Sequence, residues 1–147
     1  MAKARIAVIG AGLMGHGIAQ VFALAGHDVT IYDQMIAALG NVQERIAANL
    51  KDLGENPKVA VRVQPIFKLA DAVRDADYVV EAVLEDLKLK QKLFAEIETH
   101  VRPDTIPASN TSVITIPTNS KGLKRPRPPP GPPWWHPPFP VPPAAAD

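Results

Sequence analysis

The chain has 147 residues, which is enough for one domain with its own core and too few for two ordinary domains. Hydrophobic residues make up 46% of it and charged residues 21%, as in ordinary globular proteins, and the net charge of +1 creates no attraction for nucleic acid or anionic membranes. The chain contains no cysteine, which excludes disulfides, thiolate catalysis and zinc–thiolate sites.

The segments of the chain alternate between strand-like and helix-like patterns. Short apolar, β-branched runs predict strands over residues 4–10, 27–33, 59–63 (at an edge), 76–83 and 105–110. Apolar spacings of three and four predict helices over residues 13–25, 35–53, 67–74 and 86–101. This alternation indicates right-handed βαβ units, so we predict an α/β fold: a doubly wound Rossmann fold with a mostly parallel sheet of about five strands.

The apolar positions of three of these helices define their expected faces. They are Leu13, Ile18, Phe22 and Ala25 in the first; Leu39, Val42, Ile46, Leu50 and Leu53 in the second; and Leu89, Leu93, Phe94 and Ile97 in the last. In the final strand we expect Pro107 to remove one hydrogen-bond donor from the sheet.

Composition changes sharply near residue 121. Residues 1–120 contain five prolines, whereas residues 121–147 contain eleven and both tryptophans. We therefore predict a folded domain over 1–120 and an irregular Pro-rich tail over 121–147. No apolar run approaches the ~20 residues that cross a bilayer, and the N-terminus lacks the features of a secretory signal, so we expect a cytoplasmic protein.

A glycine pattern of the form G-x-G-x-x-G lies directly between the first strand and the first helix. Gly10 permits a tight turn, Gly12 lets the backbone approach a pyrophosphate, and Gly15 allows the helix to pack closely on the strand. The cofactor-binding residues predicted in this loop are Gly10, Ala11, Gly12, Leu13, Met14 and Gly15.

An acidic residue follows the second strand. Asp33 comes 18 residues after Gly15, where a carboxylate accepts hydrogen bonds from the adenosine ribose of a dinucleotide. It would repel a 2′-phosphate, and no arginine follows in the next few residues, so NAD is the expected cofactor rather than NADP. His16 lies near the expected pyrophosphate position, and we expect it to face solvent. The histidines are too widely spaced for a metal site.

Three segments together resemble the NAD-binding domain of 3-hydroxyacyl-CoA dehydrogenases and their 3-hydroxybutyryl-CoA relatives. They are "VIGAGLMGHGIA" (8–19), "VVEAVLEDLKLKQKLFAEIE" (79–98) and "ASNTS" (108–112). The resemblance implies that Glu85 and Lys90 lie at the nicotinamide end of the cofactor, and that Ser112 bonds the substrate carbonyl as a catalytic residue with Asn110 beside it. Composition alone favours a different interpretation, in which Glu85 is a helix N-terminal acid and Lys90 a solvated helical lysine, and the resemblance reverses that preference.

The resemblance also implies a reaction: hydride transfer from C3 of a 3-hydroxyacyl-CoA to NAD, with a histidine as the base. The family's motif for that histidine aligns without a gap on residues 131–145, but Pro133 stands at the histidine and Ala145 at its glutamate. We consider His136, three residues later, a poor substitute, so this chain is expected to bind NAD without turning over acyl-CoA. The family's helical C-terminal domain, which makes the homodimer, is expected to be absent.

Two alternatives stay open at this point. The chain could be a non-catalytic NAD-binding module whose Pro-rich tail engages SH3- or WW-type grooves. It could also derive from a related 3-hydroxy acid dehydrogenase of the gulonate or carnitine type, since these share Trp135, Pro137 and Pro138.

Overall fold

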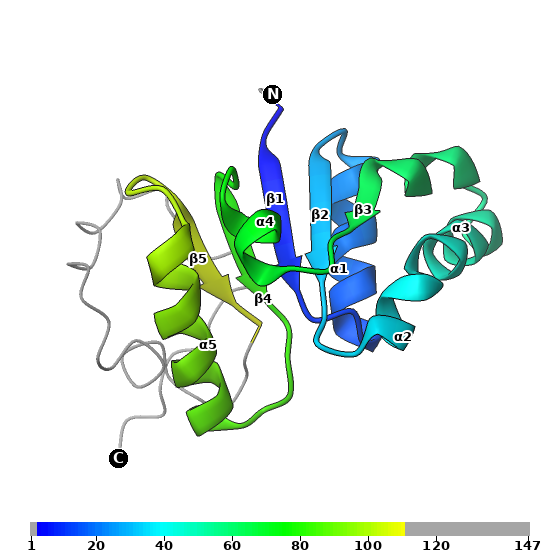
Figure 1. Cartoon of the computed structure of the whole chain (residues 1–147). Coiled ribbons are helices and arrows are strands. Elements are labelled where there is room, and N and C mark those ends of the chain that lie inside the picture. Colours follow the sequence, from blue (N-terminus) through cyan, green and yellow to red (C-terminus); the bar gives the residue numbers. More distant parts are fainter. Residues whose placement is uncertain (1–2, 111–147) are drawn as a thin grey trace, which may run out of the picture.

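The structure is a computed structural model that describes residues 3–110 of the chain (Figure 1). Its elements are β1 (Arg5–Ile9), α1 (Leu13–Leu24), β2 (Asp28–Tyr32), α2 (Ile36–Gly40), α3 (Val42–Asp52), the 3-10 helix η1 (Pro57–Arg62), β3 (Val63–Pro65), α4 (Leu69–Val73), β4 (Tyr78–Glu81), α5 (Leu87–His100) and β5 (Ile106–Ser109). The strands form one sheet in the order β3-β2-β1-β4-β5, and every pairing is parallel. The predicted doubly wound α/β fold with five strands is confirmed.

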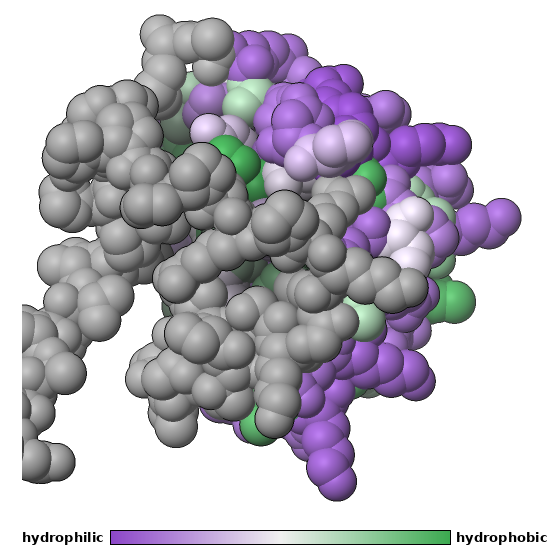
Figure 2. All heavy atoms as spheres, turned by 90° about the vertical axis from the view of Figure 1, so that its left-hand side faces the viewer, coloured by the Kyte–Doolittle hydropathy of each residue, from purple (hydrophilic) through white to green (hydrophobic). Residues whose placement is uncertain are grey.

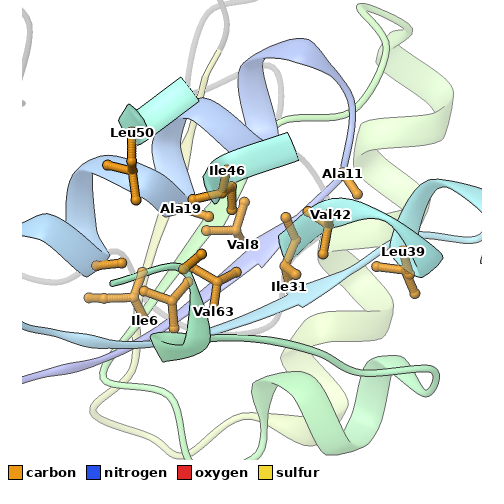
Figure 3. Close-up of a cluster of buried hydrophobic side chains, with 13 residues drawn as sticks. Ile6, Val8, Ala11, Ala19, Ile31, Leu39, Val42, Ile46, Leu50 and Val63 are labelled. Carbon is orange, nitrogen blue, oxygen red and sulfur yellow. The ribbon is translucent and has the colours of Figure 1, made fainter. Parts of the chain in front are cut away.

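Alternate residues of the central strand β1 enter two different apolar clusters, one on each face of the sheet. Ile6 and Val8 pack with residues of α1, α3, β2 and β3 (Figure 3). Ala7 and Ile9 pack instead with residues of α4 and α5, which lie in front of the sheet in Figure 1. The sheet is therefore covered on both faces, which explains why β1 is apolar at every position from Ile6 to Ile9.

The segment predicted as the third strand, 59–63, is mostly a 3-10 helix. Asn56 caps η1 by accepting a hydrogen bond from the Lys58 N–H at 3.0 Å, and Pro57 takes the first helical position. This local start signal outweighs the β-branched composition, because Pro at the first position and Asn at the cap both favour a helical turn. The strand itself is displaced to Val63–Pro65, where it pairs with β2 at the edge of the sheet.

The helix predicted over 35–53 is two helices, because the chain turns between them at Asn41, which has φ −122° and ψ 13°. The apolar positions Leu39, Val42, Ile46 and Leu50 are all buried as expected. Leu53 is 66% exposed because it lies just after α3 ends.

The buried face of α1 differs from the expected one. Its buried residues are Gly15, His16, Ala19, Gln20 and Ala23, whereas Leu13 is 82% exposed. Small residues at 15, 19 and 23 let the helix axis approach the sheet closely, so the larger apolar side chains lie at the margins of the contact or outside it. In α5, Leu93, Phe94 and Ile97 are buried and Leu89 is half-buried.

The proline in β5 does not interrupt its ladder with β4. The Ile106 N–H donates to the Asp77 carbonyl at 3.0 Å and the Asn110 N–H donates to the Glu81 carbonyl at 2.8 Å. Because donors alternate along a strand, the nitrogen of Pro107 faces away from β4. The expected loss of a donor therefore does not affect this pairing.

An ion-pair cluster ties the strand starts together at the amino edge of the sheet. Asp77 accepts hydrogen bonds from the Arg5 backbone N–H at 2.8 Å, from the Arg5 guanidinium at 3.1 Å and from the Arg102 guanidinium at 2.7 Å. These bonds, chiefly the one from the Arg5 side chain, hold the pKa of Asp77 well below its usual range. The cluster joins β1, β4 and the loop before β5, on the edge opposite to the glycine loop.

Where atoms of the described residues are visible in Figure 2, the surface on the β5 side is mainly hydrophilic, with separate apolar residues between. In the described part of the chain, no helix has the length and apolarity needed to cross a membrane. The predicted tail over 121–147 lies outside the described residues.

Candidate cofactor-binding site

The carboxyl ends of β1 and β4 meet where the chain reverses its direction across the sheet. From β1 the chain continues outward to β2 and β3, and then returns to the other side of β1 as β4 and β5. The loop after β4 contacts the end of β1, since the Ala82 N–H donates to the Ile9 carbonyl at 2.8 Å. Open α/β sheets bind ligands in the crevice outside this point.

The three motif glycines have different surroundings. Gly10 has φ 109°, and a Cβ added to it would lie 2.5 Å from the Ala82 carbonyl oxygen. A Cβ on Gly15 would lie 1.7 Å from the Gly10 carbonyl oxygen, whereas a Cβ on Gly12 would meet no atom within 4 Å. Packing within the protein therefore explains the glycines at 10 and 15, while the space beside Gly12 is open.

Asp33 holds the glycine loop against the end of β2. One carboxylate oxygen accepts the Ala11 N–H at 2.8 Å and the other accepts the Met35 N–H at 2.8 Å. The Gly10 N–H donates to the Tyr32 carbonyl at 2.7 Å, which adds a backbone bond beside this contact. A carboxylate oxygen can accept two hydrogen bonds, so the half-buried Asp33 retains capacity for ribose hydroxyls.

The N-terminus of α1 has the properties of an anion site. Gly12 is its N-cap and supplies no side-chain cap, and the first turn has no acidic residue. The first N–H groups of a helix have no partner within the helix, and its dipole is positive at this end. Leu13 and Met14 are 82% and 56% exposed, so the first turn is accessible. These residues fit the pyrophosphate of a dinucleotide.

His16 is buried, which contradicts the expectation that it faces solvent. It is 6% exposed, its Nδ1 lies 2.7 Å from the Gly12 carbonyl oxygen, and its Nε2 lies 3.2 Å from the Asn49 side-chain nitrogen. The Nδ1–H tautomer satisfies both contacts, because Nδ1 then donates to the carbonyl and Nε2 accepts from the amide. His16 therefore braces the glycine loop from behind, against α3.

Arg45 supports the same loop and was not identified from the sequence. Its guanidinium donates to the Ala11 carbonyl at 2.7 Å and to the Ala38 carbonyl at 3.0 Å. The arginine reaches the loop from α3, 12 residues after Asp33, beyond the stretch in which a dinucleotide-binding arginine was sought. Ala11 is thus held from both sides, through its N–H by Asp33 and through its carbonyl by Arg45.

A buried ion cluster lies at the carboxyl end of β4. The Lys90 ammonium is 3.0 and 3.1 Å from the two carboxylate oxygens of Glu81, and 3.1 Å from a carboxylate oxygen of Glu85. The side chains of Glu81 and Lys90 are fully buried, while that of Glu85 is 38% exposed. The interpretation of Lys90 as a solvated helical lysine is therefore wrong, and Glu85 and Lys90 do lie together.

The end of β5 joins this cluster through Ser109, whose hydroxyl donates to Glu81 at 2.5 Å. Asn110 follows immediately and is placed beside β4 by its backbone bond to Glu81. Ser112, the predicted catalytic residue, lies outside the described residues, as do Pro133, His136 and Ala145.

The structure thus brings the predicted residues into two groups along one edge of the sheet. Asp33 contacts the glycine loop, and Glu85, Lys90 and Asn110 gather around Glu81. Glu81 was missed because it was read as part of an apolar strand. An acidic residue in a strand buried on both faces needs a buried partner, and that rule could have identified it.

The chain matches the family described as the NAD binding domain of 3-hydroxyacyl-CoA dehydrogenase over residues 5–142. It is 37% identical over 132 residues to a probable 3-hydroxyacyl-CoA dehydrogenase of Caenorhabditis elegans, covering 81% of this chain and 43% of that protein. It is 40% identical over 124 residues to the mitochondrial hydroxyacyl-coenzyme A dehydrogenase of Rattus norvegicus, covering 76% of this chain and 40% of that protein.

Solved structures agree with the sequence comparison. A 3-hydroxybutyryl-CoA dehydrogenase from Escherichia coli K12 matches with a TM-score of 0.78 and 34% identity, over 84% of this chain and 28% of that one. The chain spans less than half the length of each of these relatives. Because the family match covers most of the chain and the fold agrees with it, this chain belongs to the 3-hydroxyacyl-CoA dehydrogenase family through its NAD-binding domain, and its cofactor is NAD.

Proposed function

We propose that NAD(H) binds along the carboxyl edge of the sheet, with its adenosine ribose on Asp33 and its pyrophosphate over Gly12 and the start of α1. The nicotinamide then lies toward Glu85 and Lys90. The observation that carries this proposal is that Asp33 holds the glycine loop closed, while the space beside Gly12 and the first turn of α1 stays open.

The same geometry supports NAD over NADP. The Asp33 carboxylate lies where a 2′-phosphate would have to bind, and like charges at that distance repel. Arg45 is the nearby cation, and its guanidinium already donates to the carbonyls of Ala11 and Ala38. Turning it toward a phosphate would leave the buried Ala11 carbonyl without a donor.

For the activity, we propose that the protein to which this domain belongs oxidises 3-hydroxyacyl-CoA to 3-oxoacyl-CoA, in fatty acid β-oxidation or 3-hydroxybutyryl-CoA metabolism. NAD, when bound, accepts the hydride from C3 of the substrate. Ser112 would bond the substrate oxygen. The chain itself carries Pro133 where the family has its base, and proline has no titratable group, so we expect the protein as given to bind NAD without turnover.

The experiment is a fluorescence titration of the full chain with NADH and NADPH, followed by an assay of NADH oxidation with acetoacetyl-CoA. We expect saturable NADH binding, an NADPH dissociation constant at least about 10-fold higher, and no turnover. Absence of NADH binding up to about 1 mM, the weak end of cofactor affinities, would contradict the cofactor site. Turnover at a rate of about 10 per second, ordinary for an enzyme, would contradict the loss of the base.

Location, assembly and domain limits stay predictions. We propose a cytoplasmic protein; the rat relative is mitochondrial by name, so the cell compartment needs its own measurement. We also propose that a homodimer forms only where a helical C-terminal domain follows, and that the folded domain covers 1–120 with a Pro-rich tail over 121–147. The alternative substrates, gulonate- and carnitine-type hydroxy acids, are distinguished from 3-hydroxyacyl-CoA by comparing turnover with each compound.

A further inference from the structure

The Glu81 carboxylate accepts four hydrogen bonds at the carboxyl edge of the sheet. It lies on β4 and is fully buried. One of its oxygens accepts the Val83 N–H at 2.8 Å and the Lys90 ammonium at 3.0 Å. The other accepts the Lys90 ammonium at 3.1 Å and the Ser109 hydroxyl at 2.5 Å. A single side chain thus holds the loop after β4, helix α5 and the end of β5.

Stability alone does not explain this arrangement. A buried ion pair contributes little net stability, because removing both charges from water costs about as much as their attraction returns. Apolar residues would fill the same space on a parallel strand, as they do at Val79 on the same strand. We therefore look for a role of the Glu81–Lys90 pair other than stabilising the fold.

The cluster has a buried side and a solvent side. Lys90 is held by both oxygens of Glu81 below and by Glu85 above, and Glu85 is the partly exposed member. The ammonium has three hydrogens, so bonds to two carboxylates fix its orientation as well as its position. Ser109, on the other side of Glu81, directly precedes Asn110.

We propose that Glu81 is the positioning residue of the nicotinamide half of the cofactor site. It holds Lys90, and through it Glu85, on one side, and Ser109 with the following Asn110 on the other, so that both sides of the nicotinamide pocket keep a fixed spacing. This inference rests on the proposed binding of NAD(H) along this edge. Glu81 touches neither cofactor nor substrate in this role.

The test compares two ligands that share the adenosine half. NADH occupies the whole site, whereas ADP-ribose lacks the nicotinamide and contacts only the Asp33 and Gly12 end. The variants are Glu81→Gln, which keeps the shape of the side chain, and Ser109→Ala, which leaves the ion pair in place. Asp71→Asn is the matched control, because Asp71 lies on α4 and forms an exposed ion pair with Arg74, which follows the helix.

We expect Glu81→Gln to raise the NADH dissociation constant about 10-fold and to reduce the emission shift of bound NADH, with the ADP-ribose constant changed less than about 2-fold. Ser109→Ala is expected to raise the NADH constant by about 2- to 5-fold, since it removes one of the bonds to Glu81. Asp71→Asn is expected to match the wild-type chain in both titrations.

Glu81→Gln leaves a buried ammonium with a weaker partner, so its thermal unfolding is measured alongside. If it does not fold, Ser109→Ala carries the test, because it keeps the buried ion pair and is expected to raise the NADH dissociation constant selectively, by the smaller factor given above. Equal weakening of NADH and ADP-ribose would make Glu81 a purely structural residue and overturn the inference, as would unchanged NADH binding. If the wild-type chain binds no NADH, the proposed function fails and this inference with it.

Discussion

Alanine at Gly15 and alanine at Gly12 should have different effects. Gly15→Ala should lower the stability of the domain, whereas Gly12→Ala should weaken cofactor binding. In Gly15→Ala the new Cβ would lie 1.7 Å from the Gly10 carbonyl oxygen, well inside the 3.0 Å that real Cβ contacts keep. The obstacle is backbone, so α1 or the loop must move by about 1.3 Å. Overpacking of this kind costs about 3 kcal/mol, at the upper end of its usual range, or about 10 °C in Tm for a domain of this size.

Gly12→Ala has the opposite expected profile. The site is open, and Gly12 has φ −70° and ψ −165°, which any residue can adopt. Lower entropy of the unfolded chain offsets the poorer helix cap, so stability should stay within about 1 kcal/mol of wild type. The methyl group would nevertheless occupy the space proposed for the pyrophosphate. We therefore expect the dissociation constant of NADH to rise at least about 10-fold.

The two variants are compared by thermal unfolding followed by circular dichroism, and by NADH titration at a temperature where both are folded. A Gly15→Ala chain with the wild-type Tm would refute the packing argument. A Gly12→Ala chain that binds NADH normally would refute the placement of the pyrophosphate.

Three further predictions concern other parts of the domain. Arg45→Met should cost about 1–3 kcal/mol and weaken ADP-ribose binding, because it leaves the buried Ala11 carbonyl unpaired; unchanged values in unfolding and titration would contradict this. Asp77→Asn should make the free energy of unfolding less sensitive to acid. The pKa of Asp77 is depressed in the folded state, so the stability that its carboxylate contributes is complete above about pH 5 and is lost as pH falls through the folded pKa. Unfolding curves of the wild-type chain and the variant between pH 7 and 2 measure the difference. Ile46→Ala should destabilise the domain by about 2–5 kcal/mol in denaturant unfolding without changing NADH affinity, since Ile46 is fully buried in the cluster between α3 and the sheet; a loss below about 1 kcal/mol would mean that the site collapses to fill the cavity.

The order of elements and the place of the cofactor loop follow from local patterns. The apolar run of β1, the glycines after it and Asp33 after β2 each act over a few residues, and together they imply a parallel sheet with a dinucleotide at its carboxyl edge. The φ of 109° at Gly10 agrees with the tight turn that the motif implies, and the contact with Ala82 adds a second reason for glycine there. The close packing expected at Gly15 is against the Gly10 carbonyl.

Local patterns predict the wrong element or the wrong exposure in two situations: where a second local signal competes, and where a residue distant in sequence supplies a partner. The 59–63 segment has strand-like residues, yet the Asn56–Pro57 start makes it a 3-10 helix and moves the edge strand to 63–65. His16 and Lys90 look like surface residues by type and spacing. They are buried because Asn49 and Glu81, 33 and 9 residues away, supply partners that only the packed chain brings near.

The sequence by itself determined the fold class, the strand count and the cofactor, since these depend on periodicity and on short motifs. Only the tertiary structure decided which partners hold the glycine loop and which hold the buried charges at the end of β4. Ala11 is held between Asp33 and Arg45, and Glu81 joins three segments that are separate in sequence. The physical reason is that burial of a charge or of a backbone group requires a partner, and partners are chosen by proximity in space rather than along the chain.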